Sequence, residues 1–149
     1  DVSLANADAE ANSLDIEKVG AGASYAVVWE DLRDDQVHLA VGTQSTAPID
    51  VAITDLPGGA DDARLVWSGR HLGVVYQQQG DPTCGNDGQI EFALVDLTGA
   101  VLSVAQLGEC GGDHPDIVWT GSYFLAVWDE PAPAAREGIW AVLIEPPVN

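Results

Sequence analysis

Carboxylates are the side chains of this protein best suited to chemistry, because 24 Asp and Glu residues stand against only 5 Lys and Arg residues. Asp15, Asp62 and His114 share one position of an internal repeat, and Asp113 precedes the last of them. Oxygen ligands, roughly six to eight of them, are what Ca²⁺ takes. We therefore expect these four residues to bind a divalent cation, Ca²⁺ first. The competing interpretation is that solvated acids cap strand ends without any metal.

Two further acidic pairs directly follow Val-Trp sequences. Glu30 and Asp31 follow the first, and Asp129 and Glu130 follow the second. Loops on a fixed scaffold are where binding residues tend to lie, so we expect these four residues to bind a ligand. Glu30 and Asp129 also occupy equivalent repeat positions, and glycoside hydrolysis uses paired carboxylates. An extracellular glycan hydrolase is therefore the alternative function.

The two cysteines, Cys84 and Cys110, lack the spacing of a zinc site. The sequence contains no Met and begins with Asp1, which we interpret as the processed product of an exported precursor. An even number of cysteines in an exported chain predicts a disulfide and an extracellular location. By the chain-entropy argument, the bond contributes about 3 kcal/mol to stability.

The net charge of −19 excludes several classes of partner. A surface this acidic repels phosphate backbones and anionic membranes, so neither nucleic acid nor insertion into a membrane is expected. No apolar run approaches the roughly 20 residues of a membrane-spanning helix. Serine and histidine are present, but no nucleophile-elbow sequence accompanies them. No catalytic residue is assigned.

Three similar segments organise the chain. Each contains an apolar run that ends in an aromatic residue, followed by two polar residues: SYAVVWED from Ser24, HLGVVYQQ from His71 and YFLAVWDE from Tyr123. Extended backward without a gap, the alignment brings together Gly22, Gly69 and Gly121. Extended forward, it brings together Ala40, Ala93 and Ala141. Internal repeats of this kind are typical of propeller or solenoid architectures.

Each copy predicts four short strands, because its apolar runs are short and bounded by Gly, Pro, Asn and Asp. We expect an all-β fold with almost no helix. One domain spans residues 1–149, with its copies at about 15–56, 62–108 and 114–146. The third copy lacks a fourth strand. Residues 1–6 are predicted to supply it and so to cover an open sheet edge.

The best-preserved pattern reads V-W-x-G-x-x-[YF]-L-x-V-W followed by an acid, and residues 118–129 carry it. It resembles the repeats of secreted bacterial β-propeller proteins. The first copy departs from it at Gly20, where a Trp would stand. The resemblance implies four-stranded antiparallel blades, three per chain. It also implies a functional face made by the loops between second and third strands and by the segments that join blades. A two-sheet β-sandwich is the alternative fold.

Three blades do not close a ring, since propellers have about four to eight. Open blades would leave apolar faces in water, which predicts a homo-oligomer, six-bladed as a dimer. We therefore expect a secreted, non-enzymatic binding or assembly module. Its ligand, a glycan, a protein or a divalent cation, would bind the acidic loop face. A structural filament subunit is a further alternative.

Overall fold

The computed structural model describes residues 11–22, 24–43, 45–80, 82–84, 87–132 and 136–147. These residues form strands and turns and no helix, so the all-β prediction is confirmed. In this part of the chain, accordingly, no helix is long and apolar enough to cross a membrane. Residues 1–6, the predicted closing strand, lie outside the described residues.

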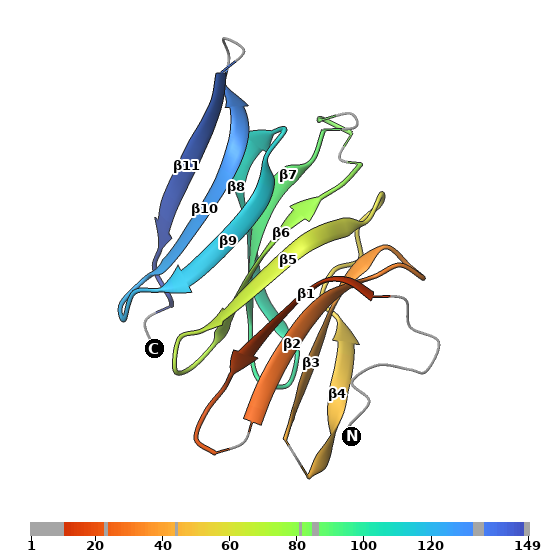
Figure 1. The fold of residues 1–149 in the computed structure, drawn as a ribbon, viewed down its shortest axis with the longest axis vertical. Helices are drawn as coiled ribbons and strands as arrows, with labels where there is room; N and C mark the ends of the chain where they lie inside the picture. The colour runs from red at the N-terminus through yellow and green to blue at the C-terminus, as the bar shows by residue number, and fades with distance from the viewer. Residues whose placement is uncertain are drawn as a thin grey trace.

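Among the described residues, eleven strands form three antiparallel sheets, in each of which neighbours in sequence are neighbours in space (Figure 1). Sheet 1 contains β1 (Ala11–Lys18), β2 (Ser24–Asp31), β3 (Gln36–Thr43) and β4 (Thr46–Ala52). Sheet 2 contains β5 (Ala60–Trp67), β6 (Leu72–Gln78), β7 (Gln89–Val95) and β8 (Val101–Cys110). Sheet 3 contains β9 (Asp113–Trp119), β10 (Phe124–Ala132) and β11 (Arg136–Ile144). The β-sandwich alternative would have required two sheets.

Sheet 2 lies between the other two, and its first strand β5 contacts both β1 and β9 (Figure 1). One apolar cluster joins sheets 1 and 2 and includes Leu39 and Val74. A second joins sheets 2 and 3 and includes Phe92 and Phe124, whose ring centroids are 5.4 Å apart. A Cβ on Gly73 would lie 2.7 Å from the Phe124 ring, so this strand glycine permits the close approach.

Each first strand has a one-residue β-bulge near its start. The regular pairing with the second strand is interrupted between Asn12 and Asp15 in β1, between Asp61 and Arg64 in β5, and between Asp113 and Asp116 in β9. The residues at the bulges are Ser13, Asp62 and His114, with φ of 47°, 48° and 49°. Asp and His are among the residues that tolerate this left-handed region best. The bulge therefore defines one equivalent position in all three sheets.

The bulges show that the predicted equivalence of Asp15 with Asp62 and His114 is wrong. Backbone bonds close the first turn from Val19 to Ser24, a longer turn than those from Ser68 to His71 and from Thr120 to Tyr123. The first strand of sheet 1 is therefore displaced against the gapless alignment. Its bulge residue is Ser13, and Asp15 corresponds instead to Arg64 and Asp116.

The predicted equivalence of Ala141 with Ala40 and Ala93 is also wrong, by one residue. Ala40 and Ala93 pair with Val27 and Val74, whereas the corresponding partner in sheet 3 is Val142. A slip of one residue moves a side chain to the other face of a sheet.

The loops between second and third strands meet the segments that join the sheets, as expected for one face. Ala60 N donates to Asp35 O at 2.8 Å, and Gln79 N donates to Gly59 O at 3.0 Å. Gly111 N donates to Gly88 O at 2.6 Å. We call this end of the molecule, formed by residues 32–35, 53–59, 79–88 and 111–112 as far as they are described, the loop end.

Candidate functional site

A disulfide joins Cys84 and Cys110 at the loop end, with Cα atoms 5.1 Å apart, so this prediction is confirmed. It ties the loop that follows β6 to the last residue of β8. The bond therefore holds together two segments that flank the opening described next.

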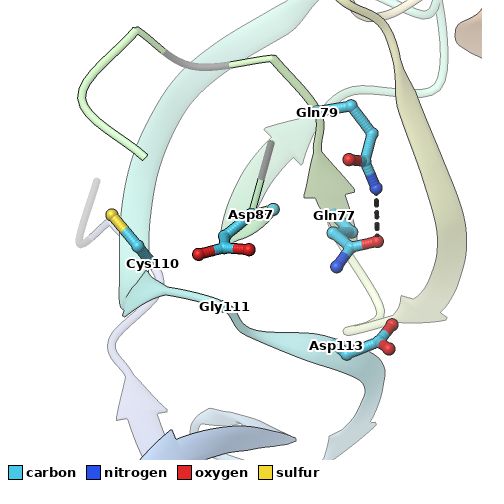
Figure 2. Close-up of a pocket in the computed structure, with 7 residues that line it drawn as sticks. Gln77, Gln79, Asp87, Cys110, Gly111 and Asp113 are labelled. Atoms are coloured by element: carbon cyan, nitrogen blue, oxygen red, sulfur yellow. Dashed lines mark hydrogen bonds between the residues drawn. The ribbon is translucent and has the colours of Figure 1, made fainter. Parts of the chain in front are cut away.

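A pocket of about 450 Å³ opens beside the disulfide, where sheet 2 meets the start of sheet 3 (Figure 2). Its walls come from β6, the loop after it, the end of β8 and the start of β9. The lining is polar and acidic: Gln77, Gln79, Asp87, Gly88, Cys110, Gly111 and Asp113. Chain segments far apart in sequence thus contribute to one concave surface.

Two glutamines form the inner wall of this pocket. Gln77 is only 8% exposed, and its Nε2 donates to Gly112 O at 2.6 Å. Its Oε1 accepts a bond from Gln79 Nε2 at 2.6 Å, the dashed line in Figure 2. A Cβ on Gly88 would lie 2.5 Å from the Gln77 side chain, so the wall packs tightly against the loop. Gln77 is therefore held in one orientation.

Carboxylates from two sheets gather behind and beside this wall. Gln79 Nε2 lies 3.3 Å from both carboxylate oxygens of Asp61. Burial raises the pKa of Asp61, and the charges of Asp62 and Asp113 raise it further. Like charges close together disfavour ionisation of each other, and a bound cation relieves this cost.

Glu30 of sheet 1 belongs to the same acidic group. Burial raises its pKa, and the charge of Asp61 is the next largest cause. Asn12 opposes the shift through a side-chain hydrogen bond to Glu30. Glu30, Asp61, Asp62 and Asp113 thus come from all three sheets, and we call them the acidic cluster. Their common potential is negative and favours a positively charged ligand.

His114 lies at the edge of the acidic cluster with its ring engaged. Its Nδ1 is 3.1 Å from Asp129 Oδ1 and 3.5 Å from Asp113 Oδ2. The hydrogen bond to Asp129 and the charge of Asp113 raise the pKa of His114. These carboxylates favour the protonated ring, which is a poor metal ligand. Among the described residues, no three His, Cys, Asp or Glu side chains are arranged to hold a metal ion.

Asp15, the remaining predicted cation ligand, bridges sheets 1 and 2 instead of joining the cluster through its carboxylate. Its Oδ1 accepts a bond from Ile16 N at 2.8 Å, and its Oδ2 accepts one from Leu65 N at 3.0 Å. Close by, Ser13 Oγ donates to Asp62 Oδ1 at 2.9 Å. The bond from Leu65 N to Asp15 and the bond from Ser13 to Asp62 both cross between β1 and β5.

Two of the four predicted ligand-binding acids are buried and hydrogen-bonded within the fold. Asp31 is fully buried and pairs with Arg33, whose hydrogen bonds hold the pKa of Asp31 well below its usual range. Glu130 is 7% exposed and accepts bonds from Trp128 Nε1 at 2.8 Å and from Glu109 N at 3.3 Å. These two carboxylates stabilise turns and strand ends.

The other two predicted ligand-binding acids belong to different outer sheets. Glu30 lies in sheet 1 and joins the acidic cluster through Asp61 and Asp62. Asp129 lies in sheet 3 and is bonded to His114. Because sheet 2 lies between sheets 1 and 3, the described contacts do not bring Glu30 and Asp129 together as a catalytic pair.

Sequence reasoning missed the glutamine wall and Asp61. One signal for the wall was available, because the second copy reads Tyr-Gln-Gln-Gln where the other two read Trp followed by two acids. At the position shared by Glu30, Gln77 and Asp129, the glutamine is the buried residue and the two acids are half-buried. The proximity of Asp61 depends on the bulge, which no residue pattern indicated.

Comparison with protein-family models found no match for this chain. A search of curated proteins found no significant match either. The interpretation of the site therefore rests on its own geometry.

Proposed function

We propose that the three sheets are blades of a β-propeller and that the chain is a non-enzymatic binding module. Its ligand carries a positive charge, such as the ammonium group of a polyamine or basic peptide, or a divalent cation. This group binds in the pocket at the loop end. The disulfide supports an extracellular location, because such bonds persist in oxidising compartments.

The propeller part of the proposal is supported by the way the sheets recur. All three are antiparallel meanders with a bulge at one corresponding position of the first strand. The first strands lie side by side, with β5 in contact with β1 and β9. Sheet 2 is covered on both faces, as a blade inside a ring is.

The single observation that carries the ligand proposal is that the pocket, lined by Asp87 and Asp113, adjoins an acidic cluster whose carboxylates come from all three sheets. Gln77 uses both its amide nitrogen and its amide oxygen within the wall, and the charged groups that face the pocket are carboxylates. Asp87 and Asp113 line the opening itself, as Figure 2 shows. Burial raises the pKa of Asp61, repulsion from Asp62 and Asp113 raises it further, and a cation entering there offsets that repulsion.

Calorimetric titration at neutral pH and low salt tests this proposal, with spermidine and CaCl₂ as separate probes. We expect binding of at least one probe, weakened several-fold by Asp113→Asn. The matched control is Asp96→Asn, which removes the same charge from the turn between β7 and β8, away from the pocket. Equal weakening by both variants would mean that only the overall negative charge attracts cations. That result, or no binding, would overturn the proposal.

A further inference from the structure

The outward side of sheet 3, the side away from sheet 2, is apolar and open. Ile139 is 87% exposed there, whereas the residues at the same position of sheets 2 and 1, Ile90 and Val37, are fully buried. Leu143 is 60% exposed, whereas its counterpart Leu94 is 3% exposed. In sheets 1 and 2, these positions pack against the next sheet along the chain.

The outward side of sheet 1 is open along its first strand. Ile16 is 65% exposed, whereas its counterparts Leu65 and Ile117 are 4% and 8% exposed. Farther from this strand the same side is buried, in a small cluster around Trp29. Between the two areas lies an apolar hollow of about 240 Å³, lined by Leu14, Asp15, Ile16 and Val27.

We infer that the outward side of sheet 3 docks on the outward side of sheet 1 of a second copy of this chain. The inference rests on the proposed propeller. Sheet 2 packs against sheet 1 with one side and against sheet 3 with its other side. At both contacts, the earlier sheet in the chain uses the same one of its two sides, and the later sheet uses the opposite one. Sheet 3 offers the side that sheets 1 and 2 present to their successors, and sheet 1 offers the side that sheets 2 and 3 present to their predecessors. A contact between them repeats this packing along the first strand of sheet 1, which is open, whereas Trp29, at the position of Tyr76, is already buried in the single chain.

The occupant is a second copy because the two open sides match each other but face away from each other in one chain (Figure 1). A head-to-tail contact between two copies forms twice when the ring closes, so both open sides of both copies become covered. The product has six blades, which lies within the range of closed propellers.

One polar group of the interface between sheets 1 and 2 has its counterpart on sheet 3. Asp15 of sheet 1 bonds its own neighbour Ile16 through Oδ1 and reaches the next sheet at Leu65 N through Oδ2. Asp116 occupies the same position in sheet 3, is exposed, and likewise accepts a bond from its neighbour Ile117 N through Oδ1. Asp116 thus presents a carboxylate to the docking copy where Asp15 presents one to sheet 2.

Sedimentation of single and mixed variants tests the inference. We expect the wild-type chain at twice its 15.6 kDa, with a dimer that tightens as salt screens the −19 charge of each copy. Ile139→Asp and Ile16→Asp each weaken it by about 100-fold or more, because an unpaired carboxylate is costly to bury. Val104→Asp, at a half-exposed position on β8, is the matched control and leaves the dimer intact.

Mixing decides the head-to-tail geometry. Ile139→Asp chains and Ile16→Asp chains each have one intact side, so together they form a dimer with one unaltered contact. A monomeric wild-type chain, or an Ile16→Asp chain that dimerises like the wild type, would overturn the inference. The pocket is assayed separately, so a monomer that binds spermidine or CaCl₂ leaves the proposed ligand site standing. A dimer whose cation binding ignores Asp113→Asn rejects that site alone.

Discussion

Sheets 2 and 3 are built from similar strands but differ in how much of them is buried. Every residue of β6 is buried, and so is nearly all of β7, whereas β11 exposes every residue from Ile139 to Leu143 except Val142, which is half-buried. The pattern of apolar side chains predicts two buried faces in both sheets. Sheet 2 has a neighbour on each side, and sheet 3 has one. Whether an apolar side chain of this protein is buried therefore depends more on the presence of a neighbouring sheet than on the residue type.

Truncating one side chain at the same position of each sheet should show this difference most strongly. Ile90→Ala should lower the free energy of unfolding by about 2–5 kcal/mol, because it leaves a cavity in a packed core. Ile139→Ala should change it by about 0.5 kcal/mol or less in the dissociated chain. Urea unfolding at high dilution measures both. Equal losses would mean that the outward side of sheet 3 is already covered in a single copy.

Removal of the disulfide should have the next largest effect. The bond closes a sequence separation of 26 residues, so Cys84→Ser with Cys110→Ser should cost about 3 kcal/mol. The strands of sheet 2 remain paired without it, so the circular dichroism of the folded variant should stay that of a β protein. The loop end should become more open to proteolysis between residues 79 and 88. Unchanged stability would indicate that sheet pairing alone positions this loop.

The sequence predicted the second strands well because their aromatic and β-branched residues leave little choice. It predicted the bond between Cys84 and Cys110 because an even number of cysteines in a chain interpreted as exported favours a disulfide. It misplaced Asp15 because the longer turn before Ser24 is not visible without the pairing. The sequence did not predict the positions of the bulges for a related reason, since a single unpaired residue changes the register but not the apolar pattern. Asp31 and Glu130 show that an acid after a strand is as easily a buried acceptor as a binding group.

The smallest expected effect compares a carboxylate near the loop end, at the start of β5, with one in the turn between β7 and β8. Asp61 has a raised pKa, first because of burial and then because of Asp62. Its contribution to stability is thus fully present below the ordinary Asp range, near pH 4, and is lost as pH rises through the folded value. Asp96 is the reverse case, since hydrogen bonds from Thr98 lower its pKa. Its contribution is present above that range and is lost as pH falls.

Asp61→Asn should therefore raise the melting temperature at pH 7 and have no such benefit near pH 3, where Asp61 is protonated in both states. Asp96→Asn should lower stability at pH 7 by about 0.5 kcal/mol, because a well-solvated charged hydrogen bond contributes little. Thermal unfolding between pH 3 and pH 7 measures both slopes. Repulsion from Asp62 and Asp113 adds to burial in raising the pKa of Asp61, so saturating CaCl₂ or spermidine should reduce the advantage of Asp61→Asn. If that advantage persists unchanged with a bound cation, burial alone destabilises the Asp61 carboxylate, and the ligand does not neutralise it.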